Sequence, residues 1–261
     1  MRETIEYDRN VSALRYEFGA QRHHDRYNLA SITSARNLYK DPEIYESDSI
    51  YDASLVLCDG VKAVLIRDVF SEAVQAVEAV APSSPEEYAR LYDRVDALYK
   101  QFGNHKFVLP EGAPPLERAL YDVDVQVSGV MQNFGDGHAA RRVFQSRAGA
   151  VYKDKGSREF HADSNAITVI VSIDGVGPEC IVDRLSYRQA QGLTASGIDR
   201  GYSKLTAPLG SMFVFKGDAA REGVMRRWYV KSLLHRSGEA EYRCALGYAY
   251  SDPAADEVIY Y

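Results

Sequence analysis

Two histidines and one aspartate in the second half of the chain have a spacing that suits a metal ion. His161 and Asp163 are two residues apart, so on a strand their side chains point to the same face. His235 is the only histidine after Asp163, so it must complete the set from a distant strand. Two imidazoles and one carboxylate form a facial triad that holds Fe(II) and leaves coordination positions open, with Zn(II) and Mn(II) as competitors.

An arginine follows at a spacing that suits a carboxylate beside the metal. Arg243 lies eight residues after His235, and its planar guanidinium can form a bidentate pair with a carboxylate. A His-x-Asp tripeptide alone is weak evidence, because it arises by chance and a strand histidine is more often a hydrogen-bonded scaffold residue. The order and spacing of all four residues together favour a metal site.

The motifs of this region resemble those of the 2-oxoglutarate/iron(II)-dependent oxygenase superfamily. Its members share, in this order, a tyrosine, a Gly-bearing turn, His-x-Asp, a strand with Pro-x-Gly, a histidine and an arginine. The resemblance covers roughly residues 145–250, and an insert at 217–227 departs from it by its length. The matching residues are Tyr152, Gly156, His161, Asp163, Pro208, Gly210, His235 and Arg243.

The resemblance implies a role for each site residue. Fe(II) is expected to bind His161, Asp163 and His235, and Arg243 is expected to bind the distal carboxylate of the co-substrate 2-oxoglutarate. Tyr152 is expected to contact the co-substrate or the substrate, with a packing role as the alternative. O2 would oxidise a substrate C–H bond with release of succinate and CO2, by hydroxylation or by a related desaturation or cyclisation. Asp163 argues against halogenation, because halogenating relatives lack this carboxylate.

Short apolar runs separated by Gly, Asp and Pro predict a mainly β fold in the second half of the chain. We expect an α+β protein with a double-stranded β-helix, or jelly-roll, core over residues 141–251 and a single domain over residues 1–261. The expected strands are 147–153, 157–163, 166–174, 179–184, 203–207, 211–216, 228–235 and 242–250.

Residues 1–140 are expected to provide strands and helices that cover this core. Residues 54–70 are apolar on both sides of an Asp-Gly turn, which predicts two short strands. Residues 71–81 predict a helix. A second helix is expected after Ser84, because Pro85 and Glu87 complete an N-terminal capping pattern and apolar residues then recur at helical spacing.

Charge and cysteine content restrict the expected partners and location. A net charge of −6 argues against nucleic acid and anionic membranes as partners, since both are bound through basic surface. No apolar run reaches the length of a membrane span, and the charged first residues do not form a signal peptide. Three scattered cysteines without a Cys-x-x-Cys motif favour a reducing cytoplasm. We therefore expect a cytoplasmic enzyme with a small-molecule substrate.

Three other interpretations stay open. The chain could hydroxylate a protein or peptide, or it could be an iron oxygenase that needs no keto acid. It could also be a cupin-like jelly roll that binds metal without catalysis. The sequence does not identify the substrate, the oligomeric state, or the roles of residues 1–50 and of the insert at 217–227.

Overall fold

The internal contacts of the computed structural model divide the chain into residues 1–34 and residues 35–261. The expected single domain over residues 1–261 stays a prediction. The residues that the structure describes all belong to the second unit; they are 36–40, 43–58, 60–80, 82–103, 107–134, 138–146, 159–196, 199, 201–217 and 232–251.

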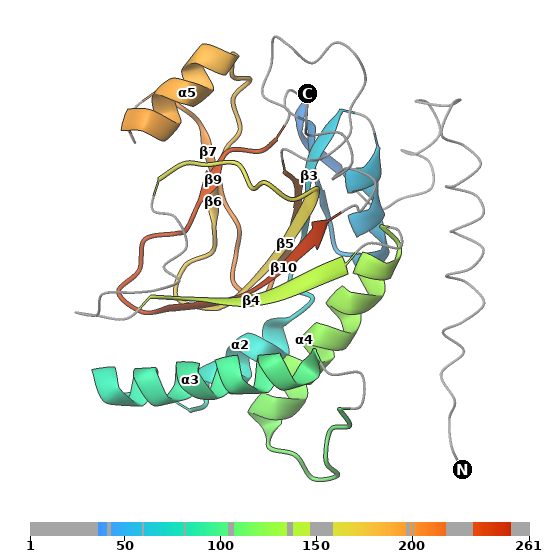
Figure 1. Ribbon diagram of the computed structural model, residues 1–261, viewed down its shortest axis with the longest axis vertical. Coiled ribbons are helices and arrows are strands. Elements are labelled where there is room, and N and C mark those ends of the chain that lie inside the picture. Colours follow the sequence, from blue (N-terminus) through green and yellow to red (C-terminus); the bar gives the residue numbers. More distant parts are fainter. Residues whose placement is uncertain are drawn as a thin grey trace. The chain divides into compact units, whose positions relative to one another are not determined.

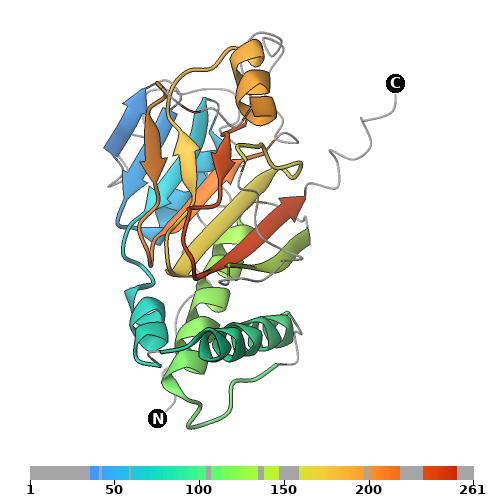
Figure 2. The same cartoon turned by 90° about the vertical axis from the view of Figure 1, so that its left-hand side faces the viewer.

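Two β-sheets make up most of the second unit, and Figure 2 shows the smaller one in front of the larger. Neighbouring strands are antiparallel in both sheets, except that β2 and β3 are parallel. The seven-stranded sheet has the order β1 (Arg36–Lys40), β2 (Glu43–Ser47), β3 (Val61–Ile66), β8 (Met212–Lys216), β5 (Ile167–Asp174), β10 (Arg243–Ser251) and β4 (His138–Ser146). The three-stranded sheet has the order β7 (Lys204–Thr206), β6 (Glu179–Ile181) and β9 (His235–Arg236).

The two sheets enclose an apolar core. Ile170, Phe213 and Ala245 of the large sheet belong to the same buried cluster as Cys180 of β6 and Leu233, which precedes β9. Because side chains alternate along a strand, the odd-numbered residues of β10 that neighbour Ala245 point into this space between the sheets.

Helices cover the opposite face of the large sheet, as Figure 1 shows for α2 (Ser71–Glu78), α3 (Pro85–Phe102) and α4 (Pro115–Gln132). The even-numbered residues of β10 face these helices. The hydroxyl of Tyr248 donates to Asp124 of α4 over 3.3 Å. The same Asp124 carboxylate accepts from Arg141 of β4 at 2.7 Å, so a buried ion pair joins helix and sheet.

The expected helices at 71–81 and after Ser84 are confirmed as α2 and α3. The Ser84 hydroxyl accepts from the backbone N–H of Glu87 at 3.3 Å. The Glu87 carboxylate in turn accepts from the backbone N–H of Ser83, one residue earlier than the capping box predicts. The expected strands at 166–174, 179–184, 203–207, 211–216 and 242–250 correspond to β5, β6, β7, β8 and β10.

Some expectations about the elements were wrong. Residues 54–57 belong to a 3-10 helix, Ile50–Leu57, and not to a strand, because a short apolar run does not distinguish a buried helical turn from a strand. The sequence interpretation also missed two helices, α4 and α5 (Tyr187–Ser196). The valines of α4 lower its intrinsic helix propensity, but its buried apolar face stabilises it.

Two expected strands flanking the histidines are only partly visible. The strand expected at 147–153 lies outside the described residues. In the described part of 157–163, the only strand pairing is an isolated bridge at His161. Of 228–235, the described part contributes His235 to β9, which has two residues.

Candidate metal centre

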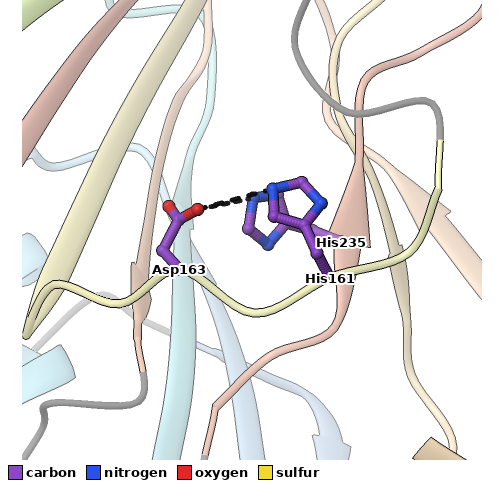
Figure 3. Close-up of side chains that lie close together, drawn as sticks. All are labelled: His161, Asp163 and His235. Atoms are coloured by element: carbon purple, nitrogen blue, oxygen red, sulfur yellow. Dashed lines mark ion pairs between the residues drawn. The ribbon is translucent and has the colours of Figure 1, made fainter. Parts of the chain in front are cut away.

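The structure brings His161, Asp163 and His235 together between the two sheets. One ligand atom from each residue lies within 4.8 Å of the others, and no other group of this kind occurs among the described residues. Oδ1 of Asp163 is 3.5 Å from Nε2 of His161 and 3.6 Å from Nε2 of His235. Figure 3 shows the carboxylate facing both rings.

A pair of backbone hydrogen bonds sets the position of the two histidines. His161 and His235 form an isolated antiparallel bridge. The N–H of His161 donates to the carbonyl of His235 at 2.9 Å, and the N–H of His235 donates to the carbonyl of His161 at 3.0 Å. Two residues that exchange both bonds have adjacent Cα atoms, so the rings lie together, with centroids 4.4 Å apart.

Both imidazole rings have the same arrangement of partners. Nδ1 of His161 is 3.0 Å from the carbonyl oxygen of Glu159, and Nδ1 of His235 is 3.3 Å from that of Leu233. A carbonyl only accepts, so each Nδ1 carries the proton and each Nε2 presents its lone pair toward Asp163. Metal-binding histidines commonly have this outer hydrogen bond.

The protonation states also suit metal binding. Burial lowers the pKa of His235 to about 4, so this ring is neutral near pH 7. Burial would raise the pKa of Asp163, but hydrogen bonds from His161 and Thr168 and the nearby His235 lower it to about 2. For His161, burial opposes the hydrogen bond to Asp163, and the net effect raises its pKa. A metal would therefore meet one carboxylate and two imidazoles, with His161 the ring that most readily holds a competing proton.

The distances in the cluster fit a single ion. Imidazole nitrogen and carboxylate oxygen bind such ions at about 2.1 Å, which places neighbouring ligand atoms about 3 to 4 Å apart. The separations of 3.5 and 3.6 Å fall within this range. Two nitrogens and one oxygen are the ligand set of non-haem iron sites.

Arg243 lies between the sheets with no anionic partner among the described residues. Its side chain is 1% exposed and belongs to the β10 face that includes Ala245. Nε donates to the carbonyl of Val176 at 2.9 Å and Nη1 donates to the hydroxyl of Ser237 at 3.3 Å. Burial lowers the pKa of Arg243 to about 10. A buried charge without an opposite charge is unfavourable, so the guanidinium suits a carboxylate ligand.

Two buried serines beside Arg243 were missed by the sequence interpretation. The hydroxyls of Ser172 and Ser211 have no hydrogen-bond partner within the described part of the chain. Ser172 of β5 pairs with Ala245 of β10. Ser211 stands opposite Ser172 by continuation of the β5–β8 register. The signal in the sequence was a polar residue inside an apolar strand run, and the two hydroxyls are available to a polar ligand next to the guanidinium.

Two predicted parts of the site cannot be placed. Tyr152 and Gly156 lie outside the described residues, so the expected contact of Tyr152 with the co-substrate stays a prediction. Most of the insert at 217–227 is also outside them; Gly217 is described and lies against the metal-site loop. No helix of the described residues is long and apolar enough to cross a membrane.

No protein-family model matches this chain, and no curated protein is similar to it in sequence. Solved structures with a similar backbone are 2-oxoglutarate/iron(II) dioxygenases, the superfamily that the sequence motifs resemble. The dioxygenase for auxin oxidation 1 from Arabidopsis thaliana, bound to 2-oxoglutarate, is 12% identical with a TM-score of 0.39, over 78% of this chain and 86% of that one.

Two further structures have comparable similarity. The rice dioxygenase for auxin oxidation is 14% identical with a TM-score of 0.42, over 79% of this chain and 80% of that one. A full-length dioxygenase from Neurospora crassa, in complex with alpha-KG, is 11% identical with a TM-score of 0.40, over 83% of this chain and 88% of that one. Because these identities and TM-scores are low, the function of this chain has to be inferred from its own site.

Proposed function

We propose that this chain is a non-haem Fe(II)/2-oxoglutarate-dependent oxygenase that oxidises a C–H bond of a small molecule. The observation that carries the proposal is the convergence of His161, Asp163 and His235, with both Nε2 atoms facing one carboxylate oxygen. The buried Arg243 without an anionic partner among the described residues supports 2-oxoglutarate as the co-substrate.

We further propose that the two sheets form a double-stranded β-helix. In support, the chain alternates between sheets: β5 is in the large sheet, β6 and β7 in the small one, β8 in the large, β9 in the small and β10 in the large. His161 extends the small sheet by its bridge to β9. This winding would place the metal site between the sheets, at residues contributed by opposite ends of the sequence motif.

The proposed roles follow from the position of each residue. His161, His235 and Asp163 would hold Fe(II), and Asp163 would offset one of its charges. Bound iron would supply the O2 chemistry, in which 2-oxoglutarate, O2 and a C–H bond give succinate, CO2 and an alcohol. Arg243 would orient the co-substrate through its distal carboxylate. The ring of Phe215, with its centroid 4.4 Å from that of His235, provides an apolar wall that limits access of water.

Anaerobic titration of the metal-free protein tests the proposal. Addition of Fe(II) and then 2-oxoglutarate should produce a weak visible absorption band, as the superfamily resemblance implies, and Asp163→Ala should abolish it. Fe(II) binding without a band would favour an oxygenase independent of keto acids or a cupin-like binder. Undiminished Fe(II) binding by Asp163→Ala would refute the assigned ligands.

Substrate screening would then separate the remaining interpretations. Succinate formation above the uncoupled background, measured with pools of small molecules and with peptide pools, should rise only with the true substrate class. We expect the response with small molecules; a response confined to peptides would identify a peptide hydroxylase instead.

A further inference from the structure

The two oxygens of Asp163 have different partners. Oδ1 faces Nε2 of both histidines at 3.5 and 3.6 Å. Oδ2 points the other way and accepts a hydrogen bond from the hydroxyl of Thr168. Thr168 belongs to β5 and is 4% exposed, so this bond is shielded from water.

Asn165 fixes the direction of that hydrogen bond. Its Nδ2 lies 2.6 Å from the carbonyl oxygen of Ile167 and 2.7 Å from Oγ1 of Thr168. The carbonyl can only accept, so the amide must present its NH2 group to both atoms. Oγ1 of Thr168 therefore accepts from Asn165, and its single proton is directed to Asp163.

The three groups form a chain of donors in one direction, from the amide to the hydroxyl to the carboxylate. Each bond polarises the next one, which strengthens the chain in a buried environment. Oδ2 of Asp163 is thereby occupied, while the lone pairs of Oδ1 stay directed toward the histidines.

We propose that Thr168, oriented by Asn165, is a positioning residue that reserves Oδ2 of Asp163 and leaves Oδ1 as the single metal-binding oxygen of this carboxylate. The inference rests on the proposed function. A carboxylate that turned to use both oxygens would fill one more position of the metal. Thr168 would thus keep that position open for the co-substrate or O2, although it touches neither.

Matched substitutions at Thr168 test this role by metal binding alone. Thr168→Val keeps the shape of the side chain and removes the hydroxyl, whereas Thr168→Ser keeps the hydroxyl. Affinity for Co(II), measured by anaerobic calorimetry, should fall about 10- to 100-fold in Thr168→Val, the usual effect of losing an outer hydrogen bond to a ligand. Thr168→Ser should bind within about threefold of the unsubstituted protein.

The visible spectrum of bound Co(II) provides a second readout, because its intensity reports the coordination number. Thr168→Val should shift this spectrum and Thr168→Ser should restore it. Asn165→Ala, which removes the orienting amide but not the hydroxyl, should give an intermediate affinity, and it serves as the test if Thr168→Val does not fold. Thermal unfolding of the metal-free variants checks the fold.

The outcomes separate this inference from the proposed function. If the unsubstituted protein binds Co(II) and 2-oxoglutarate, and the variant tested, Thr168→Val or Asn165→Ala, has the same Co(II) affinity and spectrum, then only the role of Thr168 is refuted. Absence of metal binding in the unsubstituted protein would refute the proposed function and this inference with it.

Discussion

At the scale of single residues, the site combines satisfied and unsatisfied buried groups. The metal-site imidazoles each have a backbone carbonyl at Nδ1, and Asp163 has a partner on both oxygens. Arg243, in contrast, has only neutral partners among the described residues. A group that is incompletely paired in the ligand-free protein is the expected mark of a binding residue, because the ligand supplies the missing partner.

The charge of Arg243 should therefore matter for binding more than for folding. Arg243→Met should weaken 2-oxoglutarate binding about 10- to 100-fold, since a charge-assisted hydrogen-bond pair is lost. The free energy of unfolding of the ligand-free protein should change by no more than about 1 kcal/mol, because an unpaired buried charge is removed together with two hydrogen bonds. Calorimetry and denaturant unfolding measure the two effects.

Arg243→Lys is the matched control, since it keeps the charge and loses the planar fork. It should recover only part of the affinity, while the Co(II) affinity should stay unchanged in both variants. Unimpaired 2-oxoglutarate binding by Arg243→Met would move the carboxylate site elsewhere.

At the scale of elements, the metal loop depends on a close approach to the end of β8. Gly217 follows β8, and its N–H donates to the carbonyl of Ala166 at 3.0 Å. A Cβ at Gly217 would come within 2.1 Å of the carbonyl oxygen of Asn165 and 2.7 Å of that of Asp163. Both contacts are with backbone, so neither can be relieved by a side-chain rotation.

Gly217→Ala should consequently disturb the metal site. We expect a loss of unfolding free energy of about 1 to 3 kcal/mol from overpacking, with weaker Co(II) binding because the loop carrying Asp163 must move. Gly192→Ala in α5 is the control, since a Cβ there meets nothing within 4 Å. It should stabilise the protein by about 0.5 to 1 kcal/mol without affecting Co(II). Equal behaviour of the two variants in chemical unfolding would contradict this account.

At the scale of the whole second unit, the helices on one face of the large sheet are joined to it by polar groups far from the metal. Asp124 is 4% exposed and accepts from Arg141 and Tyr248 of two adjacent strands. Arg141 also donates to Ser128 of α4 at 2.8 Å. The network lies on the helix side of the sheet, whereas the metal ligands lie on the other side.

Loss of Asp124 should thus affect folding and not the site. Asp124→Ala should lower the free energy of unfolding by about 3 kcal/mol, because it leaves the buried guanidinium of Arg141 unpaired. Co(II) affinity of the folded fraction should be unaltered. The double variant Asp124→Leu with Arg141→Met should regain part of the stability, and a loss of Co(II) affinity in either variant would show that the two faces of the sheet are coupled.

Local patterns in the sequence were enough for several features. Helix α3 was predictable because Ser84, Pro85 and Glu87 act within a few residues of one another. The candidate ligands were predictable because His-x-Asp is a local pattern and His235 is the only later histidine. Their meeting is a finding of the structure, and their role as ligands of iron stays a prediction.

Tertiary structure alone decided the features that depend on distant residues. The hydrogen bond from Thr168 to Asp163 depends on how the loop folds back onto β5, and no spacing rule specifies it. The row of Ser172, Ser211 and Ala245 beside Arg243 exists only once three strands are in register. Short apolar runs are ambiguous between strand and helical turn until burial selects one. Sequence could therefore specify which chemical groups were present, whereas packing determined which of them were left to bind a ligand.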